Sequence, residues 1–282
     1  MLEFALELAL RAEKEILSRF RNVDVLLKPD GTVVTEADRA AERLMREIIG
    51  LEFPDDGILG EEYGESFGQT SVHTPTDAGQ TGSTEDPRPS PGRRWILDPI
   101  DGTAAFTLGL PTFGTLIALE EDGEPIVGVI HFPGTGETVY AATGMGCWYR
   151  TNDGHATQVH CDASVNTVED AYLSATGVYD TLIDPRRASH PIDLGAAIRR
   201  AGRFRFVGDC TQHALVARGF LHGAIDPEMH PWDNAAIIPC IREAGGAVST
   251  ALGQRTDLIH APSLVSAASE PLLAAILAVL NP

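Results

Sequence analysis

Two carboxylates stand close together after an apolar stretch, where they could hold a cation. Trp95–Leu97 predicts a strand, and Asp98 and Asp101 follow it directly. Side chains alternate along an extended chain, so these carboxylates converge only if the backbone bends, and Pro99 and Gly102 allow a bend. A helix that begins at this glycine would offer free N–H groups to an anion held by the cation. An acidic turn that caps a helix is the alternative interpretation, and the motif by itself leaves both open.

Two further segments carry acids at similar junctions. Glu61 and Glu62 follow a short apolar strand, and Asp233 stands at the start of an apolar helix. Taken singly, a Glu-Glu pair is usually solvated, and an Asp at a helix start is usually an N-cap. Together with Asp98 and Asp101 these segments supply carboxylates from three strand-to-turn or turn-to-helix junctions. Oxygen ligands of this kind suit Mg²⁺, which bridges protein carboxylates to a substrate phosphate.

The elements that must position these acids form a mixed α/β chain. Apolar residues recur at helical spacing from Leu2 to Phe20 and from Thr35 to Gly50. Thr35 is the expected N-cap of the second helix, Asp38 lies in its first turn, and Gly50 is expected to end it. Further helices are expected at Leu194–Ala201, Thr211–Gly219, Asp233–Gly245 and Glu270–Leu280. Besides Trp95–Leu97, strands are expected at Thr112–Glu120, Pro125–Phe132, Thr138–Ala142, Gly146–Arg150, Ala171–Ser174, Arg205–Val207, Gly223–Ile225 and Ala247–Ser249.

The chain divides into two halves at about residue 150. We expect an N-terminal α+β half over residues 1–150 with the Glu61 and Asp98/Asp101 motifs, and a C-terminal α/β half over residues 151–282 with Asp233. A turn is expected at 28–31. The stretch Ser66–Arg94 has almost no large apolar residue and is rich in Ser, Thr, Gly, Pro and Asp, which predicts an exposed loop. An insertion is the favoured interpretation of this loop, and a functional lid is the alternative.

Composition and charge exclude several classes of protein. The 282 residues contain 21 Lys and Arg against 40 Asp and Glu, a formal net charge of -19 that would repel nucleic acids and anionic lipid surfaces. The 4 cysteines are scattered and form no metal-finger pattern, which is typical of reduced thiols. The first twenty residues carry charges throughout, unlike a signal peptide, and no apolar run is long enough for a membrane span. We therefore expect a cytoplasmic protein with no nucleic-acid or membrane partner.

Taken together, the motifs resemble the inositol monophosphatase superfamily of Mg²⁺-dependent, lithium-sensitive phosphatases. They occur in that family's order and are Val34–Asp38, Gly60–Glu62, Asp98–Thr103, Trp232–Asp233 and Glu243–Gly246. A second set is similar to the histidinol-phosphatase branch and comprises Gly60–Gly64, Pro111–Leu119, Gly208–Cys210 and Asp226–Pro227 before Pro231–Asp233. The resemblance covers nearly the whole chain, from residue 28 to residue 246.

The resemblance implies a layered αβαβα sandwich with metal ions between the two halves. The implied metal ligands are Glu61, Asp98, the carbonyl of Ile100, Asp101 and Asp233. Asp38 would help to place the most loosely held metal, Thr103 would bond to Asp38 and orient the attacking water, and Glu61 would assist its deprotonation. The implied substrate-binding residues are Gly102, Thr103, Asp209, Cys210 and Asp226. The N–H groups of Gly102 and Thr103 would hold phosphate oxygens, and Asp226 would contact the end of the substrate that carries no phosphate.

The expected activity is hydrolysis of a small phosphorylated metabolite by metal-activated water. The resemblance implies two to three Mg²⁺ ions, with Mn²⁺ as an alternative metal, inhibition by Li⁺, and a homodimer. L-histidinol phosphate is the favoured substrate; the alternatives are myo-inositol monophosphate, a broad range of sugar and nucleotide phosphates, and a catalytically silent member that binds a phosphorylated ligand. Ala104 and Thr211 leave the substrate open, because the histidinol-phosphatase branch often has a basic residue and an aromatic residue there.

Overall fold

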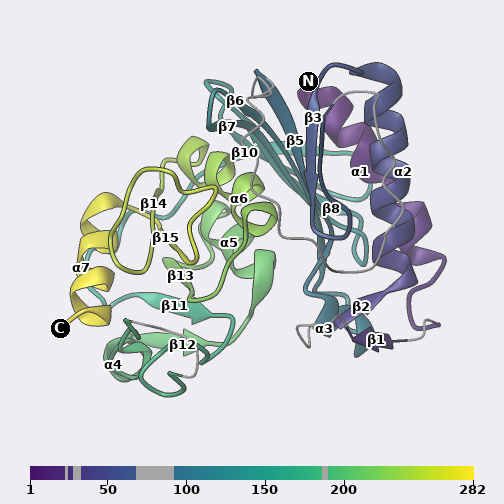
Figure 1. Cartoon of the computed structure of the whole chain (residues 1–282). Coiled ribbons are helices and arrows are strands. Elements are labelled where there is room, and N and C mark those ends of the chain that lie inside the picture. Colours follow the sequence, from purple (N-terminus) through teal and green to yellow (C-terminus); the bar gives the residue numbers. More distant parts are fainter. Residues whose placement is uncertain (23–24, 28–32, 68–91, 186–189) are drawn as a thin grey trace, which may run out of the picture.

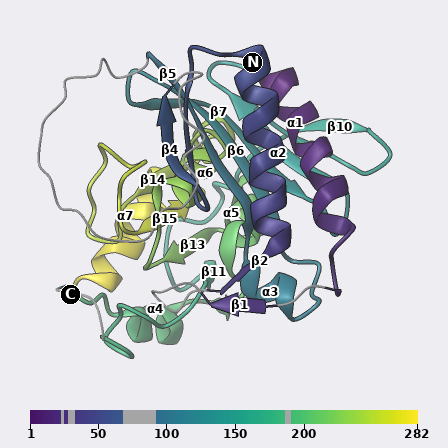
Figure 2. The same ribbon diagram turned by 45° about the vertical axis from the view of Figure 1, so that its right-hand side comes forward.

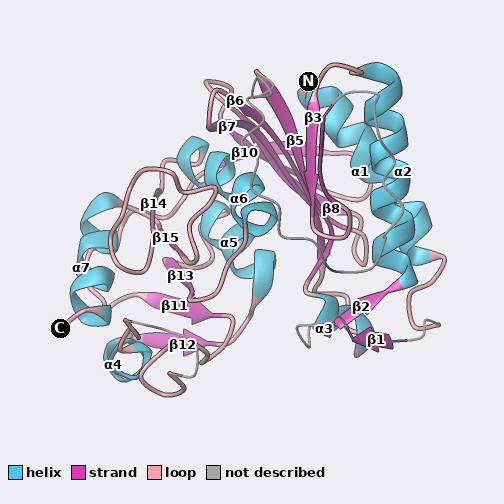
Figure 3. Ribbon diagram, viewed as in Figure 1, coloured by secondary structure: helices cyan, strands magenta, loops and turns pink. Residues whose placement is uncertain are grey.

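Helical and sheet layers alternate in the computed structural model, which describes residues 1–22, 25–27, 33–67, 92–185 and 190–282. Two helices cover the outer face of a large sheet, two more lie between it and a smaller sheet, and another pair covers the far side of the smaller sheet (Figures 1 and 3). The helices are α1 (Leu2–Leu17), α2 (Glu36–Glu52), α3 (Thr103–Thr107), α4 (Leu194–Arg200), α5 (Asp209–Ala217), α6 (Pro231–Glu243) and α7 (Glu270–Leu280). The expected αβαβα sandwich is confirmed.

The large sheet has the strand order β10-β9-β8-β7-β6-β5-β3-β4, and the turned view shows α1 and α2 lying across its outer face (Figure 2). Its strands are β3 (Gly57–Gly60), β4 (Gly64–Phe67), β5 (Arg93–Asp101), β6 (Gly114–Glu121), β7 (Glu124–Phe132), β8 (Glu137–Ala142), β9 (Cys147–Arg150) and β10 (Ala156–Val159). Neighbouring strands from β5 to β10 are antiparallel, as the predicted meander requires, whereas β3 runs parallel to β5.

The smaller sheet has the order β12-β11-β13-β15-β14. Its strands are β11 (Tyr172–Ala175), β12 (Arg203–Arg205), β13 (Gly223–Asp226), β14 (Ala247–Ser249) and β15 (Leu264–Ala267), while β1 (Val25–Leu27) and β2 (Val33–Thr35) form a separate hairpin. The large sheet includes β10, so the chain passes from one sheet to the other between Val159 and Tyr172, later than residue 150.

Apolar side chains form a core on each side of the central helices. One cluster joins α1 and α2 to the large sheet, with Trp95 and Met45 fully buried in it. A second cluster fills the space between the large sheet and α5 and α6, and a third packs α4 and α7 on the smaller sheet. The central helices therefore bury side chains on both faces, which explains why α6 is apolar almost all round. None of the helices in the described ranges is both long and apolar enough to cross a membrane.

Helix α2 follows the sequence prediction at its start and departs from it at its end. Thr35 is its N-cap, and its hydroxyl accepts the N–H of Ala37 at 3.1 Å. The helix does not end at Gly50, because this glycine lacks the positive φ of a helix-ending residue, and the Ile49 carbonyl still accepts the N–H of Phe53. Helix α1 ends at Leu17, before Phe20. The ring of Phe20 packs against the ring of Phe106, with 5.4 Å between the ring centroids.

Several other boundaries differ from those expected. The expected loop Ser66–Arg94 is shorter at both ends, because Ser66 pairs with β3 and Arg93 begins β5. Residues 68–91, the rest of that predicted loop, and the predicted turn at 28–31 lie outside the described residues. The strand expected at Arg205–Val207 is β12, two residues earlier, where its pairing with β11 sets the register.

Candidate active site

A β-bulge in β5 brings Asp98 and Asp101 together. The pairing of β5 with β6 shifts in register between these two residues, so β5 contains one residue more than its partner there. The bulge cancels the alternation that would send the two side chains to opposite faces. Pro99 has no backbone N–H, so it needs no hydrogen-bond acceptor in the bulge. Its carbonyl accepts a hydrogen bond from the hydroxyl of Thr115 at 2.9 Å. The N–H of Ile100 donates to the Asp98 carboxylate at 3.0 Å, which fixes that side chain.

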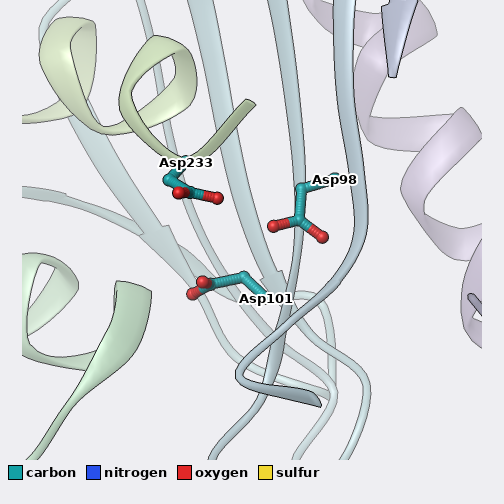
Figure 4. A group of neighbouring side chains, drawn as sticks. All are labelled: Asp98, Asp101 and Asp233. Carbon is teal, nitrogen blue, oxygen red and sulfur yellow. The ribbon is translucent and has the colours of Figure 1, made fainter. Parts of the chain in front are cut away.

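Helix α6 supplies a third carboxylate to the same point. Asp233 lies in its first turn and accepts the N–H of His230 at 2.7 Å, and Pro231 starts the helix where no N–H is needed. One carboxylate oxygen from each of Asp98, Asp101 and Asp233 lies within 4.8 Å of the others (Figure 4). In the part of the chain that the structure describes, this is the only group of three or more His, Cys, Asp or Glu ligand atoms so close together.

The three carboxylates are electrostatically crowded. Burial raises the pKa of Asp98 and of Asp233 well above the ordinary value, and the charges of neighbouring acids raise both further. Burial also raises the pKa of Asp101 to about 6, although a hydrogen bond from Cys210 opposes the rise. A hard divalent cation would relieve this repulsion, because carboxylate and carbonyl oxygens are its preferred ligands. The donor set therefore fits such a cation.

Asp38 contributes a buried oxygen that has no partner. Its Oδ2 accepts both the N–H and the hydroxyl of Thr35, at 2.8 and 2.6 Å, in the cap of α2. Its Oδ1 is buried and accepts no hydrogen bond from any residue within the described ranges. Burial raises the pKa of Asp38 to about 6, with a further rise from the charge of Glu61. Such an orphaned oxygen needs a ligand or a water to satisfy it.

Glu61 lies in the turn after β3, beside the three aspartates. Its N–H donates to the carbonyl of Leu97 at 3.2 Å, which ties the turn to the neighbouring strand β5. The charge of Glu61 raises the pKa of Asp98, Asp233 and Asp38, so its carboxylate is close enough to act on all three. Its oxygens fall outside the 4.8 Å group.

The turn that carries Glu61 is held by Glu42, a buried carboxylate on α2. Glu42 accepts the N–H groups of Glu62 and Tyr63, at 2.7 and 3.2 Å, and the Nε–H of Arg46 at 2.7 Å. Gly60 is required here, because an added Cβ would lie 2.1 Å from the Glu42 Oε1 atom. The carboxylate therefore fixes the backbone that follows Glu61 and packs closely against Gly60 before it.

Gly102 and Thr103 form the start of α3, as the sequence predicts. Gly102 has a φ of 81°, and an added Cβ would lie 2.8 Å from a carboxylate oxygen of Asp209, so glycine is required. The Thr103 hydroxyl donates to the carbonyl of Ile100 at 3.0 Å. The expected bond from Thr103 to Asp38 is therefore wrong: the Ile100 carbonyl lies in the same turn, and the cap of α2 already supplies a hydroxyl to Asp38.

Asp209 and Cys210 begin α5 next to these residues. Burial, together with the charges of Asp101 and Asp226, raises the pKa of Asp209 to about 8. The backbone N–H of Cys210 donates to Asp101 at 2.5 Å. The Cys210 thiol is buried against Gly114, and burial raises its pKa well above the ordinary value. It therefore stays protonated, and Cys210 contributes its backbone rather than a nucleophile.

Asp226 ends β13 and lies close to the same group. Its side chain is buried, and its charge raises the pKa of Asp101, Asp209 and Asp233. Its Oδ2 accepts the Thr176 hydroxyl at 2.6 Å and the Gln212 amide at 3.1 Å. This carboxylate therefore has two side-chain donors, whereas Asp98, Asp101 and Asp233 each accept a backbone N–H.

All the residues singled out from the sequence thus meet around the carboxyl end of β5, while a few that support them were missed. Glu42 could have been found, since it stands four residues after Asp38 on the same face of α2. Thr176 and Gln212 gave no sequence signal, because they meet Asp226 only through tertiary structure: Thr176 through the pairing of β11 with β13, and Gln212 through the packing of α5 on β13. Ala104 is exposed on α3, and the buried hydroxyl of Thr211 has no partner.

Comparisons with known proteins agree with this geometry. The sequence matches the model of the inositol monophosphatase family over residues 1–281. It is 41% identical over 269 residues to a histidinol-phosphatase of Chlorobaculum parvum, covering 94% of this chain and 91% of that protein. It is 36% identical over 254 residues to a histidinol-phosphatase of Mycobacterium tuberculosis, covering 88% and 86%.

A solved structure shares the whole fold. An IMPase from Thermotoga maritima matches with a TM-score of 0.76 at 26% identity, covering 99% of this chain and 95% of the other. The match extends over both sheets, so the layered arrangement that brings β5 and α6 together is common to the two proteins.

Proposed function

The chain belongs to the inositol monophosphatase family of phosphoric monoester hydrolases, and we propose that it hydrolyses L-histidinol phosphate with Mg²⁺ as cofactor. The proposed dependence on Mg²⁺ rests on the group of Asp98, Asp101 and Asp233, in which one carboxylate oxygen of each residue lies within 4.8 Å of the others. The similarity to two histidinol-phosphatases along most of the chain supports the substrate.

The residues proposed to hold Mg²⁺ are these three aspartates, Glu61 and the carbonyl of Ile100. Two to three ions would balance the charge of so many acids, and Mn²⁺ accepts the same oxygen ligands. Bound Mg²⁺ supplies positive charge that neutralises phosphate oxygens and makes water more acidic. The Ile100 carbonyl already accepts one hydrogen bond from Thr103 and keeps its second lone pair for a ligand.

The chain's own groups would then place the reactants. The N–H groups of Gly102 and Thr103, at the start of α3, would bond the phosphate oxygens. Water attacks phosphorus from the side of Glu61 and Asp38, and Glu61 takes its proton. The unpartnered Oδ1 of Asp38 would accept a hydrogen bond from the same water and orient it. The ester P–O bond breaks, and the released alcohol oxygen takes up a proton from solvent.

The other end of the substrate would meet Asp226 and Asp209. L-histidinol phosphate carries a protonated amine, and a buried carboxylate can form a charge-assisted hydrogen bond to it. The repulsion that raises the pKa of Asp209 is relieved when a cation binds between the acids. An uncharged polyol such as inositol would not relieve it, which favours the amine.

Inositol phosphate remains the second candidate, because the Thermotoga maritima IMPase has the same fold. Inhibition by Li⁺, a homodimeric assembly and a cytoplasmic location stay predictions.

The proposed function is tested by phosphate release from a substrate panel. The panel contains L-histidinol phosphate, inositol 1-phosphate, fructose 1,6-bisphosphate and adenosine 3′,5′-bisphosphate, each with Mg²⁺ and with a chelator. We expect the highest kcat/KM with L-histidinol phosphate and loss of all activity with the chelator. A clear preference for an inositol phosphate would overturn the substrate, and full activity without metal would overturn the mechanism.

A further inference from the structure

A network of hydrogen bonds holds one oxygen of Asp226 and leaves the other open. Oδ2 accepts the hydroxyl of Thr176 at 2.6 Å and the amide of Gln212 at 3.1 Å, and Nε2 of His213 lies 3.7 Å from it. No donor in the described residues reaches Oδ1, although the side chain is only 5% exposed. All the support of this carboxylate therefore comes from one side.

Donor and acceptor counting fixes the orientation of the Gln212 amide. Its Nε2 also donates to the Thr176 hydroxyl oxygen at 2.8 Å, so both amide protons are used. The reverse orientation would place the amide oxygen against the Asp226 carboxylate, with two acceptors facing each other. Thr176 in turn accepts the backbone N–H of Asp209 at 3.0 Å. The Thr176 hydroxyl thus ties Asp226 to the first residue of α5, and the buried Gln212 amide bonds both Thr176 and Asp226.

His213 lies near the same oxygen, beyond hydrogen-bond distance. Its ring is fully buried, and Nδ1 lies 2.8 Å from the hydroxyl oxygen of Ser266 on β15. Nε2 has no hydrogen-bond partner among the residues that the structure describes, and it lies 3.7 Å from the carboxylate. A proton on Nε2, with the Ser266 hydroxyl donating to Nδ1, is the arrangement that suits a neighbouring carboxylate.

We propose that Gln212 and His213 are positioning residues that fix Asp226 so that its Oδ1 is presented to a protonated amine on the substrate. The inference rests on the proposed function and specifies which residues set the preference for an amine-bearing phosphomonoester. Gln212 and His213 do not touch the substrate; they act through Asp226. Because Oδ2 already has its donors, the open oxygen needs a donor from outside the protein, and a cation is the strongest.

The test compares Gln212→Met with the wild type on two substrates. Methionine keeps the length of the side chain and removes the donors. With L-histidinol phosphate we expect KM to rise about tenfold while kcat changes less than about threefold. With p-nitrophenyl phosphate, which carries no cation, both constants should stay within about twofold. Thr176→Val removes the second donor at an exposed position and should give the same pattern if Gln212→Met folds poorly.

Two controls separate positioning from general loss of stability. Thr138→Val removes a buried hydroxyl that bonds His131 in the large sheet, far along the chain from Asp226, and should leave the KM ratio of the two substrates unchanged. Adding Gln212→Met to Asp226→Asn should cause no further rise in KM for L-histidinol phosphate, because its effect passes through Asp226.

The outcomes are distinct. Equal losses on both substrates, or additive effects in the double variant, would overturn the role of Gln212 while leaving the phosphatase intact. A wild-type enzyme that shows no preference for the amine-bearing substrate would overturn the proposed substrate and this inference together.

Discussion

The crowded group of Asp98, Asp101 and Asp233 lies close to a second carboxylate site, Asp226, and their surroundings differ in kind. Asp98, Asp101 and Asp233 crowd one another within 4.8 Å, and each receives little more than one backbone N–H. Asp226 instead receives two side-chain donors on a single oxygen. Crowded negative charge with few donors suits a metal ion, whereas a carboxylate fixed by donors on one side suits an organic cation on the other.

The contrast shows that neighbouring acidic residues can indicate two different kinds of site, one for a metal ion and one for an organic cation. In the first group the fold itself creates repulsion, through the bulge in β5 and the start of α6, and a bound cation must relieve it. In the second group the fold supplies a matched set of hydrogen bonds before any ligand arrives. Changes in the first group should therefore affect every substrate, and changes in the second should affect only substrates with an amine.

The largest effect is expected from the crowded group. Asp98→Asn and Asp233→Asn each remove charge from the proposed metal site and should lower kcat at least about a hundredfold for all phosphomonoesters, a loss of about 2.7 kcal/mol of transition-state stabilisation. Circular dichroism should show an intact fold. A variant that keeps more than about a tenth of the activity would remove that residue from the metal ligands.

A smaller and selective effect is expected at Asp226. Asp226→Asn keeps an acceptor for Thr176 and Gln212 but places a neutral amide where the amine would bind. The kcat/KM for L-histidinol phosphate should fall about ten- to a hundredfold, and that for p-nitrophenyl phosphate less than about threefold. Equal losses on the two substrates would mean that Asp226 acts on the fold or on the metal site.

The pH dependence of stability should distinguish the protein with and without metal. The pKa values of Asp38 and Asp101 are raised to about 6 and that of Asp209 to about 8, so the folded state binds these protons more tightly than the unfolded state. Their stabilisation is complete below about pH 4 and is lost as the pH rises through 6 and 8. The chelated protein should therefore melt at lower temperature at higher pH, and Mg²⁺ should reduce this fall.

A matched pair of variants isolates the contribution of Asp209 to the pH dependence of stability. Asp209→Asn removes a half-buried carboxylate at a positive φ that asparagine tolerates, whereas Asp153→Asn removes an exposed one. Only the first should flatten the melting curve against pH, by a few degrees. The same flattening in both variants would assign the pH dependence to the overall negative charge.

The smallest effect is expected at Glu42, which acts on the crowded group only through the backbone. Glu42→Gln weakens the ion pair with Arg46 and loosens the turn that carries Glu61. The Mg²⁺ concentration for half-maximal activity should rise about three- to tenfold, with kcat within about threefold. Glu47→Gln, an exposed change on the same helix, should leave both unchanged. A loss of kcat with an unchanged Mg²⁺ requirement would contradict the positioning role.

The sequence predicted the crowded group far better than its neighbour, and the reason is physical. The acids of the first group stand next to strand ends and helix starts, where local patterns are strong, and α1, α2 and the meander follow from periodicity. The support of Asp226 depends on contacts between residues up to 50 positions apart, which no local pattern reveals. The sequence also failed to predict β15, because its four residues are all buried and show no alternation of apolar and polar side chains.

The bond expected from Thr103 to Asp38 failed for a related reason. The resemblance suggested a contact between two residues, but each side chain has a nearer partner within its own turn: Ile100 for Thr103, and Thr35 for Asp38. Local hydrogen bonds of Thr and Asp compete effectively with distant ones.

Calorimetric titration of Mg²⁺ into the chelator-treated protein tests the division between the two groups most directly. The wild type and Asp226→Asn should bind Mg²⁺ with the same affinity within about threefold, while Asp98→Asn should bind at least about tenfold more weakly. Equal weakening in Asp226→Asn and Asp98→Asn, or unchanged binding in Asp98→Asn, would contradict the assignment of the crowded carboxylates to metal and of Asp226 to the substrate.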